Sequence, residues 1–121
     1  MTTEISADGY TQLDIGGKIA TDWDYIEFQT SGSAKIIRIS TADSRVTQSS
    51  LTSKKVVYSV ALAGDDTDIA AAGLPKTFSK ALFKATDIDG ADILATDTFT
   101  DATLATADDR LTVTISAGVQ T

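Results

Sequence analysis

Hydrophobic and polar residues alternate most clearly over residues 110–118, RLTVTISAG. Every second residue from Leu111 to Ile115 is apolar, and the residues between them carry hydroxyl groups. Because successive side chains of a strand point to opposite faces, this pattern is typical of a half-buried strand. Residues 53–64, SKKVVYSVALAG, place larger side chains at every second position and mostly smaller ones between them. That segment predicts a more central strand.

Two further segments read as strands. Residues 34–40, AKIIRIS, are rich in β-branched side chains, and residues 22–30, DWDYIEFQT, are rich in aromatic ones. Strand patterns separated by turn-forming residues favour an all-β fold over alternating helices and strands. The sequence therefore predicts a small antiparallel sandwich or barrel-like domain.

Residues 74–87, LPKTFSKALFKATD, fit two structures. Several of their apolar residues recur at helical spacing, and Pro75 suits the first turn of a helix. Their threonine and phenylalanine residues instead favour a strand, and an Asp-Gly pair typical of a turn follows directly. The strand is the favoured interpretation, with one short helix near residues 75–85 as the alternative.

The whole chain, residues 1–121, is predicted to form a single β domain. Its length suffices to bury a core without disulfides, and no linker-like stretch divides it. Residues 1–12 are polar and loosely patterned, so they fit either a first strand or an N-terminal arm that orders on a neighbouring molecule.

Composition narrows the available chemistry. The sequence has no cysteine and no histidine, which removes disulfides, thiolate nucleophiles, cysteine-type zinc sites and the commonest general base. Almost all of its acidic residues are aspartate, which prefers turns and caps to helix interiors. The sequence therefore points away from helices and, in the absence of a specific catalytic motif, away from an enzyme.

The charge and hydropathy of the chain exclude two classes of partner. A net charge of −7 repels the phosphate backbone, so no nucleic-acid partner is expected. The apolar runs fall far short of the ~20 residues that a membrane helix needs, so no membrane association is expected. The N-terminus lacks the pattern of a signal peptide, which predicts synthesis in the host cytoplasm without cleavage.

The most acidic stretch, residues 85–109, contains a candidate calcium site. Asp87, Asp89 and Asp92 flank Gly90, and carboxylates on a tight loop are ligands that calcium prefers. The spacing does not match an EF-hand loop, in which the glycine is sixth and a glutamate is twelfth. The simpler interpretation is a two-residue Asp89-Gly90 hairpin turn without any cofactor, and calcium remains the alternative.

Two aromatic residues are candidates for an interface. Trp23 and Tyr25 lie on one face of the strand expected over residues 22–30, with Ile26 and Phe28 on the other. At least one of these faces is expected in the core. The alternatives for Trp23 and Tyr25 are a protein interface or stacking on a sugar ring.

Two other acidic groups are interpreted as turns. Asp65, Asp66 and Asp68 are expected in a solvated loop, and Asp108 and Asp109 are expected to mark the turn into the last strand.

Short motifs follow one another through the second half of the chain. They are an Ala-Gly-Leu triplet, a glycine-containing hairpin, a strand ending in phenylalanine, a Thr-Leu pair and a closing strand. They lie at Ala72-Gly73-Leu74, Asp89-Gly90, Phe99, Thr103-Leu104 and Asp109 to Thr114. From about Arg45 onward this order resembles small virion proteins of tailed bacteriophages and archaeal tailed viruses.

The resemblance implies a β-rich structural subunit that acts by assembly and carries no catalytic residue. Its expected place is the virion, first as a capsid decoration (cement) subunit and alternatively as a tail or fibre component. Its expected partners are other virion proteins and copies of itself in a homo-oligomer. An alternative from another class is a surface binding module that is calcium-supported or binds glycans.

Overall fold

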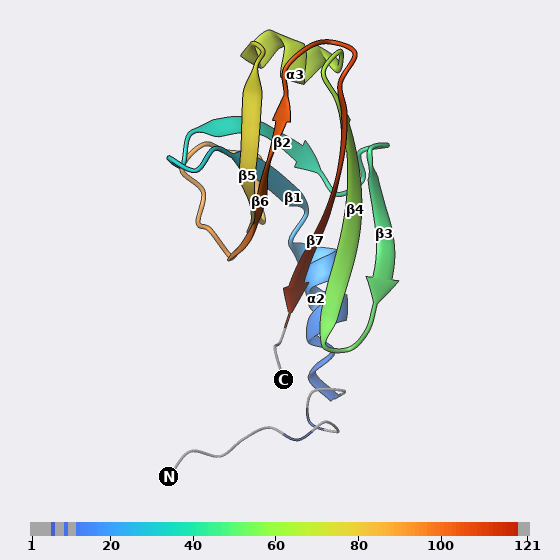
Figure 1. The fold of residues 1–121 in the computed structure, drawn as a ribbon. Helices are drawn as coiled ribbons and strands as arrows, with labels where there is room; N and C mark the ends of the chain where they lie inside the picture. Colours follow the sequence, from blue (N-terminus) through green and yellow to red (C-terminus); the bar gives the residue numbers. More distant parts are fainter. Residues whose placement is uncertain (1–5, 7–8, 10–11, 119–121) are drawn as a thin grey trace.

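The computed structural model describes Ser6, Gly9 and residues 12–118. Within this part the chain forms seven strands and two short helices (Figure 1). In chain order they are α2 (Ile15–Asp22), β1 (Tyr25–Gln29), β2 (Lys35–Ser40), β3 (Val46–Leu51), β4 (Lys55–Ala63), α3 (Thr67–Ala72), β5 (Lys76–Lys84), β6 (Ala95–Leu104) and β7 (Arg110–Gly118). The predicted all-β fold class is confirmed.

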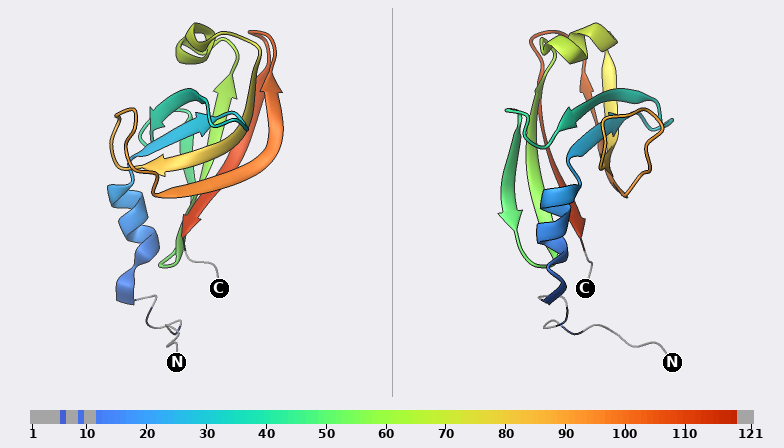
Figure 2. Two further views of the ribbon diagram at one scale, coloured as in Figure 1. Left: turned by 90° about the vertical axis from the view of Figure 1, so that its left-hand side faces the viewer. Right: turned by 180° about the vertical axis from the view of Figure 1, so that it is seen from behind.

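The strands form two antiparallel sheets. One has the order β2-β1-β5-β6 and the other has the order β3-β4-β7. Figures 1 and 2 show that β6 and β7, which follow each other in the chain, bring the two sheets together along one side. Across this junction the Ser116 amide donates to Asp97 Oδ2 at 2.8 Å. A side chain thus makes one link between strands that belong to different sheets.

Apolar side chains from both sheets form one core. Ile26 and Phe28 on β1 are fully buried, so theirs is the face of residues 22–30 that lies in the core. The rings of Phe28 and Phe78 meet edge to face at 5.8 Å, a favoured geometry for aromatic pairs. From the three-stranded sheet the core receives Val56, Tyr58, Val60, Leu62, Val113, Ile115 and Ala117. These are the alternate positions that residues 53–64 and 110–118 marked as apolar.

Residues 75–85 do not form a helix, so that alternative is wrong. Residues 76–84 are β5, paired on both sides with β1 and β6. A register irregularity between Phe78 and Lys80 lets both Phe78 and Phe83 point into the same core, although they are five positions apart and would face opposite sides of a regular strand. Leu82, which lies directly across from Glu27 of β1, is buried as well, on the opposite face of β5. Because both faces are covered, the strand lacks simple alternation.

The helix α2 was not predicted. Residues 22–30 were expected to be strand throughout, but Asp22 ends α2 and β1 begins at Tyr25. A Cβ at Gly16 would lie 1.9 Å from the carbonyl oxygen of Thr52, so this position requires glycine for close packing on the turn between β3 and β4. The expected arm, residues 1–12, lies almost wholly outside the described residues.

The helices cover opposite ends of the molecule. Figure 1 shows α3 at the end where β5 begins and α2 at the other end, beside the turn between β3 and β4. Ile69 of α3 and Ile19 of α2 are buried in the core. Neither helix, nor any other in the described part of the chain, is long and apolar enough to cross a membrane.

Candidate functional site

A group of charged side chains lies on the face of the four-stranded sheet opposite the core. Glu27 stands at the centre of this group, on β1, directly across from Arg38 on β2. Its Oε1 accepts hydrogen bonds from Arg38 Nη1 at 2.7 Å and from Lys84 Nζ at 3.2 Å. Glu27 and Lys84 are only 3% and 4% exposed, so their charges are buried as a pair. Buried charges require such partners, because desolvation of an unpaired ion is costly.

The loop of residues 85–94 folds back against this group. Asp87 Oδ1 accepts from Arg38 Nε at 2.7 Å, and Asp89 Oδ1 accepts from Arg38 Nη1 at 2.9 Å and from Lys35 Nζ at 3.0 Å. We call Glu27, Arg38, Lys84, Asp87 and Asp89 the ionic cluster. A pocket of about 410 Å³ lies between the sheet and the loop, beside Glu27 and Lys84.

The ionic cluster favours the charged form of two carboxylates, those of Glu27 and Asp89. Burial by itself would raise the pKa of Glu27, but hydrogen bonds from Gln29, Arg38 and Lys84 outweigh it and lower the pKa. Hydrogen bonds from Arg38 and Lys35 likewise lower the pKa of Asp89. A general base works best with a pKa near the working pH, so these carboxylates are suited to holding Arg38 rather than to moving protons.

The predicted calcium residues are only partly brought together. Asp87 and Asp89 point to Arg38, and Asp92 follows on the same loop. Among residues 12–118, no group of three or more acidic side chains is arranged to hold a metal ion. Calcium at this loop would compete with the Arg38 guanidinium for the same oxygens.

Asp89 and Gly90 do form a turn, in which the Ala91 amide donates to the Ile88 carbonyl at 3.1 Å. Gly90 has a φ of 82°, which suits the third residue of a type II turn. The predicted two-residue hairpin is wrong, because residues 85–94 together connect β5 to β6. The connection is long because it folds over the ionic cluster.

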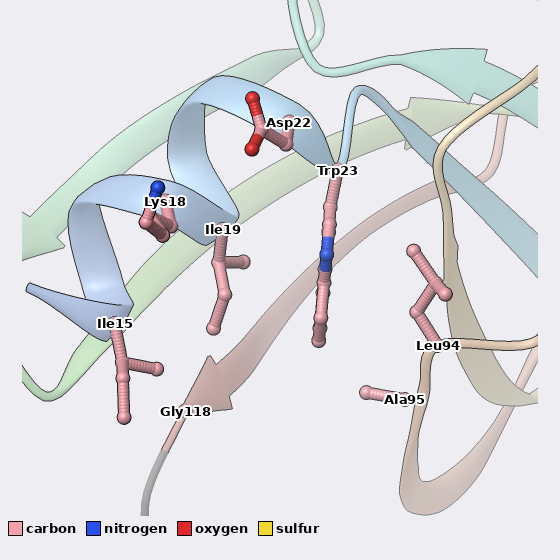
Figure 3. Close-up of a pocket in the computed structure, with 8 residues that line it drawn as sticks. All are labelled: Ile15, Lys18, Ile19, Asp22, Trp23, Leu94, Ala95 and Gly118. Carbon is pink, nitrogen blue, oxygen red and sulfur yellow. The ribbon is translucent and has the colours of Figure 1, made fainter. Parts of the chain in front are cut away.

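An apolar groove lies between α2 and the start of β6 (Figure 3). It has a volume of about 420 Å³, with Trp23 and Leu94 on its walls and Lys18 and Asp22 among its lining residues. Trp23 is half-buried and packs on Phe83 with ring centroids 6.3 Å apart. We call this feature the Trp23 groove.

The two predicted interface residues lie in different places. Trp23 follows α2 and lines the groove, whereas Tyr25 is in β1, paired in register with Ser40 and Lys84. Tyr25 therefore lies on the face of the ionic cluster. Leu94 of the groove could not have been foreseen, because its position depends on how the preceding loop folds.

The second acidic group is a solvated loop only in part: Asp65 is exposed in a turn as predicted, whereas Asp66 and Asp68 bind Arg45, which corrects the prediction for those two residues. Asp68 receives two hydrogen bonds from Arg45, each of 2.9 Å, and Asp66 receives one of 3.2 Å. Arg45 also binds Asp43, so one guanidinium connects the segment before β3 with the start of α3. We call these four residues the Arg45 cluster.

Asp109 was predicted to mark the turn into the last strand, and it does. Its Oδ2 accepts hydrogen bonds from the amides of Ala105 at 2.7 Å and Thr106 at 3.0 Å.

Several large apolar side chains remain exposed. Ile88 and Ile93, on the loop of residues 85–94, are 62% and 57% exposed, and Leu51 at the end of β3 is 47% exposed. The outer face of the three-stranded sheet is also accessible and nearly uncharged along its centre. The residues of this face are Thr47, Ser50, Val57, Ser59, Ala61, Thr112, Thr114 and Ser116.

In comparisons with known proteins, no protein-family model, no curated protein and no solved structure matches this chain.

The Arg45 cluster predicts how stability depends on pH. Hydrogen bonds from Arg45 lower the pKa of Asp43 and Asp68 in the folded protein. Their contribution is fully present above the unfolded pKa of about 3.9 and is lost as the pH falls through the lower folded value. Arg45→Gln should lower the free energy of unfolding by roughly 1 kcal/mol at neutral pH, because partly exposed ion pairs contribute little each. The difference from wild type should shrink below about pH 3.

Chemical denaturation at a series of pH values would measure this effect. Arg110→Gln is the matched control, since Arg110 and Asp65 form an ion pair in which both side chains are 60% exposed. That control should stay within about 0.5 kcal/mol of wild type at every pH. Parallel pH curves for Arg45→Gln and wild type would contradict the prediction.

Calcium should leave the thermal unfolding of the protein unchanged. A ligand that binds the folded state raises the midpoint by mass action, so melts in millimolar calcium and in EGTA provide the comparison. We expect equal unfolding midpoints, because the carboxylates of Asp87 and Asp89 already form ion pairs with Arg38. A calcium-dependent rise that Asp92→Ala abolishes would instead establish the alternative site.

Proposed function

We propose that this chain is a virion structural protein of a tailed virus, namely a capsid decoration (cement) subunit that acts through protein–protein interfaces. One observation carries this proposal: several charged side chains of the chain are paired within the molecule, whereas large apolar side chains are exposed. Arg38, Lys84 and Arg45 are engaged in ion pairs within the molecule, while Ile88 and Ile93 are exposed. Exposed apolar residues of this size are typical of surfaces that contact another protein.

The resemblance of the second half of the chain to small virion proteins supports the same proposal. An acidic surface also suits an abundant subunit, because net charge keeps unassembled copies soluble. The Trp23 groove offers a place for an apolar side chain of a capsid protein, with Trp23 as the aromatic anchor.

A tail or fibre component of the same virion is the alternative, and it would use the same surfaces at a different place on the particle. The position of Trp23 in a groove also keeps a glycan-binding surface module as a candidate from another class. Sugar-dependent quenching of Trp23 fluorescence in the isolated protein would favour that module.

The proposal predicts that purified virus particles contain the chain at a fixed ratio to the major capsid protein. Quantitative mass spectrometry of particles would measure the ratio, and imaging of particles would place the chain on the capsid or the tail. A ratio that follows the capsid lattice supports a decoration subunit. Particles that lack the chain altogether would refute the proposal.

Leu94→Lys tests whether the Trp23 groove carries the contact. Leu94 lines the groove and is partly exposed, so a lysine there places a charge at the proposed contact without opening the core. We expect at least a tenfold loss of binding to particles stripped of the chain, equal to about 1.4 kcal/mol, with little change in melting temperature. Ser31→Lys is the matched control, at an exposed turn between β1 and β2. Equal binding by both variants would exclude the groove.

A further inference from the structure

The strand β3 lies at an open edge of the three-stranded sheet. It pairs with β4, and no other strand in the described part of the chain pairs with it. In Figure 1 and in the opposite view of Figure 2, β3 is the outermost strand of its sheet. From Thr47 to Leu51 every residue is exposed. The backbone groups on its outer side therefore face solvent.

This edge lacks two of the usual protections against pairing, namely charged residues and proline. Natural proteins guard such strands with charged residues or proline, because exposed edges template the addition of another strand. The sequence of β3 is VTQSSL, with neither, whereas each of the other described strands carries at least one charged residue. A bulge at Ser49, whose hydroxyl donates to the Val57 carbonyl at 3.2 Å, adds twist but no charge.

The two ends of β3 carry opposite charges. Before it lies the Arg45 cluster, in which three carboxylates and one guanidinium leave a negative excess. After it lie Lys54 and Lys55, which are positive. If two copies of β3 pair antiparallel about a twofold axis, the acidic end of each lies against the basic end of the other. Charge complementarity of this kind steers association and selects one orientation.

The same orientation covers exposed apolar surface. Leu51 and Val46 share one face of β3, because their partners Val56 and Val60 both point into the core. Antiparallel pairing centred between Gln48 and Ser49 places Leu51 of one copy beside Val46 of the other, and the symmetry repeats this contact. An isologous interface needs only such self-complementarity.

We propose that β3 binds β3 of a second copy of this chain, which joins the two three-stranded sheets into one continuous six-stranded sheet. The uncharged outer faces of the two sheets then form one surface across the dimer. This inference deepens the proposed assembly function by naming the surface through which two copies meet. Its test uses the purified full chain without virus particles, so its failure leaves the binding to particles to be judged separately.

Light scattering after size exclusion, over a series of concentrations, would measure the association. We expect a dimer that dissociates on dilution and weakens as salt is raised, because salt screens exposed charges. Gln48→Lys should raise the dissociation constant at least tenfold, since the twofold axis brings two added charges together. Lys54→Glu should weaken the dimer as well, by removing the attraction to the Arg45 cluster. Thr98→Lys, on an exposed position of β6, is the matched control and should leave the dimer unchanged.

Hydrogen exchange at high and low concentration would identify the contact. Amides of residues 47–51 should become more protected in the dimer, while the melting temperature of diluted Gln48→Lys stays near that of wild type. A wild-type chain that is monomeric at every concentration would overturn the proposal. A dimer that survives Gln48→Lys, or one whose β3 amides gain no protection, would also overturn it and direct attention to the Trp23 groove.

Discussion

The architecture depends on the burial of one carboxylate, that of Glu27, in a sheet covered on both faces. A buried charge without partners would cost several kcal/mol, so the strands on either side must supply them. Arg38 comes from β2 and Lys84 from β5, and each reaches the same oxygen of Glu27. A slip of one residue in β1 would turn Glu27 into the core and Phe28 out of it. The ion pairs therefore fix the register of three strands.

Arg38 extends this constraint to the surface of the molecule. Its guanidinium binds Glu27 on one side and two carboxylates of the loop of residues 85–94 on the other. Held in this way, the loop exposes Ile88 and Ile93 and places Leu94 at the Trp23 groove. Because buried ion pairs add little net stability compared with apolar contacts, we interpret the ionic cluster as selecting one loop arrangement. The exposed isoleucines of the loop and the Leu94 wall of the Trp23 groove follow from that selection.

The sequence predicted the strands that have one buried and one exposed face, and it failed where that condition does not hold. β4 and β7 alternate cleanly because only their inner faces pack. β5 is buried on both faces and interrupted by an irregularity after Phe78, so its pattern resembled a helix. The helix α2 was missed because Gly16 and Gly17 disfavour helices, although close packing on Thr52 requires Gly16.

The candidate site was predicted only in part for a related reason. The aspartates at positions 87 and 89 were recognised as unusual, but their partner Arg38 lies 49 and 51 residues away in the chain. Composition and local spacing carry no information about such a contact. Trp23 was recognised as an interface candidate from its residue type, whereas the groove around it depends on how α2 and the loop pack.

The central claim is that Arg38 fastens the loop of residues 85–94 to the sheet, and hydrogen exchange at Leu94 tests it most directly. The Leu94 amide donates to the Phe83 carbonyl at 2.9 Å, so it reports whether the loop is closed. In Arg38→Gln we expect this amide to exchange at least tenfold faster than in wild type, while amides of Val60 and Val113 in the other sheet keep their protection relative to global unfolding. Unchanged protection at Leu94 in a folded Arg38→Gln protein would contradict the account.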